Sequence, residues 1–69
     1  MNIIIKGGFE MAKVGDQIRI INMRGEEQYN GREGIIEYID DIGQLHGTWG
    51  GLAVVPEEDT FEVINLGIA

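Results

Sequence analysis

The residues with the widest chemical range in this chain lie close together between positions 46 and 56. The 69 residues include one histidine, one tryptophan and one proline, and these are His46, Trp49 and Pro56. A histidine titrates near neutral pH and serves as an acid, a base or a metal ligand, whereas an indole offers a large apolar face and one hydrogen-bond donor. The segment therefore raises two hypotheses, a catalytic site and a binding surface.

The residue types disfavour nucleophilic catalysis. The chain has no serine and no cysteine, and only Thr48 and Thr60 carry aliphatic hydroxyl groups. None of the eleven glycines falls in the G-x-x-x-x-G-K pattern of a phosphate-binding loop. The sequence places no acid–base partner beside His46, so we expect this histidine at the protein surface. We predict that the protein is not an enzyme and has no catalytic residue and no cofactor.

The carboxylates are abundant, but their positions favour turns. Residues 40–43, Asp-Asp-Ile-Gly, are typical of a type I turn with the glycine at positive φ, and residues 57–59, Glu-Glu-Asp, follow Pro56 in a second predicted turn. Aspartate is favoured in turns because its side chain bonds nearby backbone amides. The chain lacks the spacing of a calcium-binding loop and the residues of a Cys/His zinc site, so we predict no metal site.

The elements that must position these residues show a period of two, which is typical of strands. The predicted strands lie at residues 17–23, 34–39, 44–49, 52–55 and 61–64. Gly50-Gly51 suits a two-residue hairpin turn between the third and fourth of them. Short strands joined by tight turns predict an all-β fold, a small five-stranded SH3-like barrel with a long first connection at residues 24–33. Residues 56–59 are predicted to form a short 3-10 turn before the last strand.

The alternation also predicts which side chains are buried. The expected core consists of Ile18, Ile20, Ile36, Ile39, Leu45, Leu52, Val54, Phe61 and Val63. We expect Trp49 to be partly buried with one ring face exposed, because Gly50 and Gly51 have no side chains to cover it. Alternation places His46 on the opposite face from Leu45 and Trp49, where it points to solvent or lies across from a neighbouring strand.

The charge balance bears on the choice of partner. Twelve acidic residues against five basic ones give a net charge of −7, which opposes non-specific binding to nucleic acid and to anionic membranes. No apolar segment has the length of a membrane span or a signal peptide, so we predict a cytoplasmic protein.

The first residues raise a separate question about where the native protein starts. The codons AAA-GGA-GGT for Lys6-Gly7-Gly8 would form a bacterial ribosome-binding sequence at a suitable distance before Met11. Met11 is then the predicted native start, and the alternative is that residues 3–5 form an extra edge strand. We divide the chain into an N-terminal extension, a barrel domain and a C-terminal tail, at residues 1–12, 13–64 and 65–69.

The order of motifs from Val14 to Ile64 resembles one known family. The motifs are Gly15-Asp16, Met23, Gly34, Asp40-Asp41-x-Gly43-x-Leu45-His46, Trp49, Leu52, Pro56, Asp59 and Phe61. They are similar to those of domain of unknown function 4314, a family of small proteins from bacteria and their phages. The resemblance implies the SH3-like fold and a mobile-element setting, and it supplies no catalytic residue.

Three functional hypotheses remain, of which a protein-interaction module is the first. Its predicted surface consists of Trp49, Tyr29, Tyr38, Glu26, Glu27, Glu33 and His46, and it would bind an unidentified basic protein. The second hypothesis is weak nucleic-acid binding near Arg24, Tyr29 and Arg32. The third is an acidic inhibitor that mimics nucleic acid and blocks a host protein. The oligomeric state is left open.

Overall fold

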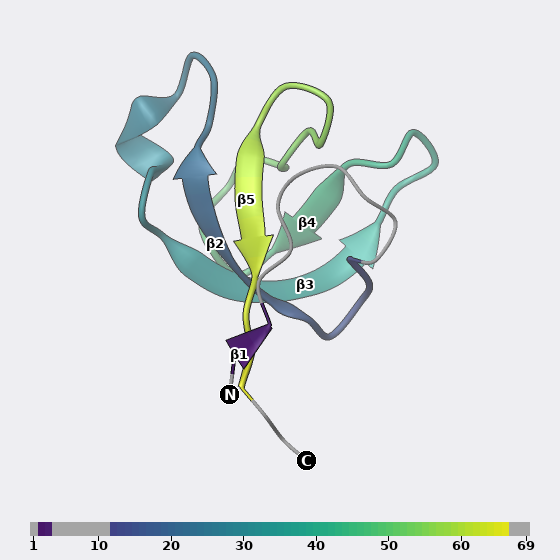
Figure 1. Cartoon of the computed structure of the whole chain (residues 1–69). Coiled ribbons are helices and arrows are strands. Elements are labelled where there is room, and N and C mark those ends of the chain that lie inside the picture. The colour runs from purple at the N-terminus through teal and green to yellow at the C-terminus, as the bar shows by residue number, and fades with distance from the viewer. Residues whose placement is uncertain (1, 4–11, 67–69) are drawn as a thin grey trace.

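The computed structural model describes residues 2–3 and 12–66, and it shows an all-β protein (Figure 1). An antiparallel sheet has the strand order β4-β3-β2-β5. Its strands are β2 (Gln17–Asn22), β3 (Glu33–Ile39), β4 (Leu45–Gly47) and β5 (Thr60–Val63). A separate antiparallel pair joins β1 (Asn2–Ile3) to β6 (Asn65–Leu66), and a 3-10 helix, η1 (Glu27–Tyr29), lies between β2 and β3. The predicted all-β class is confirmed, and residues 4 and 5 of the predicted edge strand lie outside the described residues.

Strand β2 contains an irregularity that redirects the side chains after it. Ile18 and Ile20 are fully buried, as the alternation predicts. The register with β5 then shifts between Ile20 and Asn22. Regular alternation would then bury Asn22, but Asn22 faces solvent like Ile21 and Met23 enters the core, as expected where an extra residue in one strand reverses the alternation beyond it. The sequence pattern did not predict the burial of Met23.

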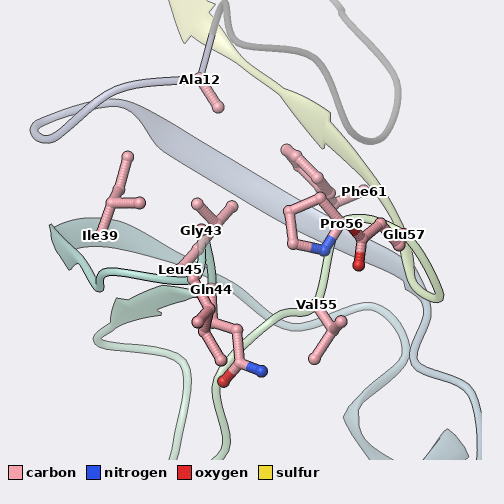
Figure 2. Close-up of a pocket in the computed structure, with 10 residues that line it drawn as sticks. Ala12, Ile39, Gly43, Gln44, Leu45, Val55, Pro56, Glu57 and Phe61 are labelled. Carbon is pink, nitrogen blue, oxygen red and sulfur yellow. The ribbon is translucent and has the colours of Figure 1, made fainter.

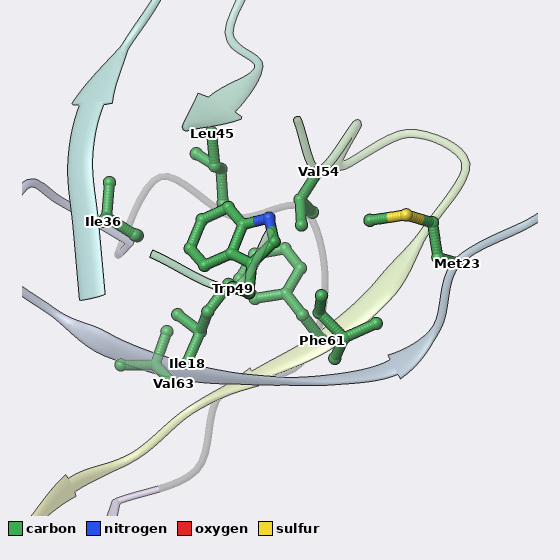
Figure 3. Close-up of a cluster of buried hydrophobic side chains, with 9 residues drawn as sticks. Ile18, Met23, Ile36, Leu45, Trp49, Val54, Phe61 and Val63 are labelled. Carbon is green, nitrogen blue, oxygen red and sulfur yellow. The ribbon is translucent and has the colours of Figure 1, made fainter. Parts of the chain in front are cut away.

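The hydrophobic core lies between the two halves of this curved sheet (Figure 3). Its buried members are Ile18, Ile20, Met23, Ile36, Leu45, Trp49, Val54, Phe61 and Val63. The predicted core is thus confirmed apart from Ile39 and Leu52, which are about two-fifths exposed (37% and 41%).

Trp49 belongs to the centre of the core, and the predicted exposed ring face is wrong. The residue is only 3% exposed, and its Nε1–H donates a 2.8 Å hydrogen bond to the carbonyl oxygen of Leu52. Gly47 makes room for the indole, since a Cβ at this position would overlap the ring and the carbonyl oxygen of Ile35. The indole is therefore covered by residues of β3 and β4. The sequence alone did not indicate that these residues pack on the ring.

The chain after β4 does not form the predicted hairpin. Leu45 pairs with Val54 in an isolated bridge, whereas a two-residue turn at Gly50-Gly51 would pair Gly47 with Val54. The connection is wider because the Trp49 indole turns inward and bonds the backbone at Leu52. Residues 52–55 consequently do not form a regular strand, and the side chain of Leu52 lies outside the core.

The predicted 3-10 turn before the last strand is also absent from its expected place. The backbone N–H groups of Glu58 and Asp59 both donate to the carbonyl oxygen of Val55, at 2.9 and 2.8 Å. The bond from Asp59 spans four residues and opens the turn beyond 3-10 geometry. The 3-10 helix of the described residues is η1, in the connection between β2 and β3.

Candidate functional site

The predicted aromatic surface does not exist as one patch. Trp49 is buried, and Tyr38 lies near the end of β3, whereas Tyr29 lies just before the start of that strand. Tyr29 is half-buried against the core, and its hydroxyl accepts a hydrogen bond from the N–H of Gly51 at 3.3 Å. The guanidinium of Arg32 lies 4.2 Å from the centre of the Tyr29 ring and donates to the carbonyl oxygen of Trp49. Tyr29 and Arg32 thus hold the 49–51 connection in place.

Two of the three glutamates predicted to border that surface stabilise their own loop, whereas Glu33 is paired with Arg19. The Glu26 carboxylate accepts a 2.8 Å hydrogen bond from the side-chain amide of Gln28, and the Glu27 carboxylate accepts one from the N–H of Gly25 at 3.3 Å. Both glutamates lie on the η1 connection, where they contribute negative charge around Tyr29.

The structure gives His46 partners that the sequence did not reveal. The imidazole stacks on the Tyr38 ring with 4.3 Å between ring centres, since the two residues are paired across β3 and β4. Its Nε2 lies 2.8 Å from Oδ2 of Asp40. This hydrogen bond, followed by one from the N–H of Gln44, lowers the pKa of Asp40 below its ordinary value. The predicted position of His46, across from a neighbouring strand, is confirmed.

The sequence supplies neither a serine nor a cysteine to act with this histidine–carboxylate pair. The hydroxyl of Thr48 accepts a 3.0 Å hydrogen bond from the N–H of Ile35. An imidazole oriented by a carboxylate still needs a reacting group within hydrogen-bond reach. The arrangement of His46, Asp40 and Tyr38 therefore explains the geometry of the hairpin between β3 and β4.

An open groove of about 600 Å³ lies on the other side of that hairpin (Figure 2). The residues that line it are Ala12, Ile39, Ile42, Gly43, Gln44, Leu45, Val55, Pro56, Glu57 and Phe61. Ile39 is paired with the buried Leu45 and lies on the same side, but the open groove leaves it partly exposed. This is why the predicted burial of Ile39 is wrong.

Two buried or half-buried aspartates hold the walls of this groove. On one wall, Oδ1 of Asp40 accepts hydrogen bonds from the backbone of Ile42 and Gln44 at 3.1 and 2.8 Å. On the other, the buried Asp59 accepts bonds from the N–H groups of Arg24 and Val55 at 3.0 and 2.8 Å. The prediction that these acids serve the turns is confirmed, because both bond the backbone of the loop that they belong to. The turn at residues 40–43 also has its predicted glycine at positive φ (85°).

Two of the basic side chains in the described part of the chain are paired with carboxylates. Arg19 is bonded to Glu33 and Glu62 at 2.9 and 3.0 Å, and Lys13 is paired with the buried Asp16 at 3.3 Å. The carboxylates beside Arg19 and Lys13 offset the positive charge of these two residues locally, so these two contribute little to binding a phosphate backbone.

Sequence reasoning missed the groove as a site. Its walls come from Ala12, residues 39–45 and residues 55–57, which are far apart in the chain. The exposed isoleucine in the turn, Ile42, was the one available signal, because an apolar residue at a turn tip has no local reason to be there.

Within residues 2–3 and 12–66, no three acidic or histidine side chains are grouped closely enough to hold a metal ion. The same residues contain no helix long and apolar enough to cross a membrane. No curated protein and no solved structure shows a significant match to the chain. A family model does match, over residues 10–64, and its description is Domain of unknown function (DUF4314). Since this match spans most of the 69 residues, the chain belongs to that family.

Proposed function

We propose that this protein is a non-catalytic interaction module that binds a basic protein partner through the groove between residues 39–45 and 55–57. The observation that carries the proposal is the apolar lining of this groove. Ile42 is 75% exposed at its rim, and Ile39 and Pro56 lie along its walls. A small protein that leaves large aliphatic side chains exposed around a concave site has the character of a partner-binding surface.

We infer an SH3-like barrel as the scaffold of this module. Across the sheet the strands follow the order β4, β3, β2 and β5, and the segment at Val54 lies beside β4 at the edge. This order supports that topology. In this interpretation the fifth strand is reduced to the single bridge between Leu45 and Val54. From the family resemblance we also propose a cytoplasmic role in a bacterial or phage system.

The charge of the protein supports a basic partner over a nucleic acid. The chain has a net charge of −7, and Arg19 and Lys13 are engaged in ion pairs. Complementary charge accelerates association with a basic protein and slows association with polyanions. No local feature of the fold separately favours the mimicry of nucleic acid, so we propose it no further.

The experiment compares affinity purification from the native host with wild-type protein and two variants. Ile42→Asp puts a charge at the groove, and Ile21→Asp does the same at an exposed isoleucine of β2 that does not line the groove. We expect one partner to be retained by wild type and by Ile21→Asp and to be lost with Ile42→Asp. Thermal melts must show that both variants fold. A partner that survives Ile42→Asp would contradict the proposed site, and the recovered partner is then used in titration calorimetry to confirm direct binding.

A further inference from the structure

We propose that the groove recognises an extended, basic peptide segment, with one apolar side chain held between the 39–45 hairpin and Pro56 and a neighbouring arginine or lysine paired with Glu57. This inference rests on the proposed function and specifies the ligand of the same site. The proposal is argued from the buried apolar floor of the groove, from the paired backbone N–H groups of its walls, and from the acidic side chains around it.

The floor of the groove is rigid because it belongs to the core. Leu45 and Phe61 are at most 3% exposed, and Figure 2 shows Phe61 beside Pro56, with Ile39 across from them. A groove of about 600 Å³ is within the range of roughly 300–1,000 Å³ for preformed ligand sites. It therefore holds an apolar side chain together with part of the peptide backbone that carries it.

The backbone N–H groups of residues 42–45 and of Val55 already donate within the chain, which disfavours recognition by strand addition. The N–H and carbonyl of Leu45 are both bonded to Val54 at 2.9 Å. The carbonyl of Val55 accepts two bonds from the following turn, and Pro56 has no N–H to donate. We therefore expect side chains to make the main contacts to a ligand, and Gln44 is the lining residue whose amide can both donate to and accept from a peptide backbone.

The charged side chains around the groove are acidic, and they favour a ligand with positive charge. Glu57 lines the groove, and Asp41 and Glu58 are exposed in the two turns that form its walls. The nearby cation, Lys13, is paired with Asp16. A cationic side chain beside the apolar anchor gains from these carboxylates, whereas an acidic one is repelled.

The same charge argues against a second copy of this chain as the occupant. Each copy carries a net charge of −7, so two copies brought together at an acidic groove repel each other. The basic segment is therefore assigned to another protein.

The test is an NMR titration of the full chain, with methyl groups labelled, against three short acetylated and amidated peptides. The first has a central leucine with arginines on both sides, the second has serine in place of leucine, and the third has glutamates in place of the arginines. We expect the first to shift the methyl signals of Ile39, Ile42 and Leu45 saturably. The second should bind at least about tenfold more weakly, since it lacks the apolar side chain that the groove would bury, and the third should not saturate.

Two glutamine variants test the role of charge. Glu57→Gln should weaken the first peptide by roughly two- to fivefold, as expected for one exposed ion pair. Glu37→Gln removes an exposed carboxylate of β3 that does not line the groove, and it should leave the affinity unchanged. Equal weakening by both variants would show that net charge alone acts and would overturn the assignment of Glu57.

The remaining outcomes separate this inference from the proposed function. If the glutamate peptide binds as well as the arginine peptide, or if the methyl shifts follow protein concentration without peptide, the basic segment is refuted. If a cellular partner is lost with Ile42→Asp but binds Glu57→Gln with unchanged affinity, the groove is a docking site and the proposed ligand chemistry is wrong. If no partner depends on Ile42, the proposed function itself fails.

Discussion

Replacing Trp49 by alanine tests whether the indole is a core residue. The side chain is 3% exposed and packs among Ile36, Val54 and Phe61, so its removal leaves a large cavity and an unpaired carbonyl at Leu52. Removal of a buried tryptophan costs about 3–5 kcal/mol. At roughly 0.05–0.15 kcal/mol per residue, a chain of 69 residues has a total stability of about 3.5–10 kcal/mol. Trp49→Ala is therefore expected to remove between about a third and all of the free energy of unfolding at 25 °C.

Urea denaturation followed by far-ultraviolet circular dichroism measures this loss without relying on the indole signal. Trp49→Phe is the matched variant, because it keeps an aromatic ring and removes only volume and the Nε1–H donor; we expect it to cost about 1–2 kcal/mol. Since Trp49 is the sole tryptophan, iodide quenching of the wild-type fluorescence should be weak. Strong quenching, together with a Trp49→Ala variant as stable as the wild type, would refute the placement of the indole in the core.

The remaining predictions concern close packing, a buried carboxylate and pH. Gly47→Ala should destabilise the fold by about 2–3 kcal/mol in urea because the new methyl overlaps the indole and a carbonyl of β3, whereas Gly51→Ala, with open space around its Cβ, should change stability by under about 1 kcal/mol. Asp59→Ala leaves two backbone amides without their acceptor and should reduce the free energy of unfolding by about 2–5 kcal/mol. A lower melting temperature would show this loss. The pKa of Asp40 is lowered in the folded state, first by the bond to His46, so its contribution to stability is present above about pH 4 and is lost as the pH falls through the folded pKa. His46→Phe keeps a ring against Tyr38 but removes that bond, so NMR should show the Asp40 pKa rising, and the stability gap between wild type and variant should close in acid.

The two faces of the hairpin between β3 and β4 have different roles in this interpretation. On the outer face, His46 stacks on Tyr38 and bonds Asp40, which in turn accepts two bonds from the turn. The inner face carries Ile39 and Ile42 along the groove. Because Asp40 fixes the turn that carries Ile42, the outer cluster supports the geometry of the inner binding surface.

Local sequence patterns predicted where the strands and turns of this protein lie better than they predicted the residues at which the strands end. The alternation around Ile18 and Ile20 predicts β2, and the β-branched run at residues 34–39 predicts β3, because side chains on a half-buried strand must alternate. The turn at residues 40–43 was predictable from its aspartates and glycine, whose backbone preferences act within a few residues. The membership of the family could likewise be recognised from the order of motifs along the chain.

Tertiary structure decided the burial of the apolar residues that depart from this alternation. Sequence alternation assumes a regular ladder, and the register shift after Ile20 buries Met23 where the pattern predicts no core residue. Trp49 was predicted to be half exposed from its glycine neighbours, yet its cover comes from β3 and from the space left by Gly47. The groove exists only because the turns that follow β3 and Val54 are brought side by side, so no short segment of the sequence contains it. Burial and concavity depend on contacts between distant residues, and a single sequence records those contacts only indirectly.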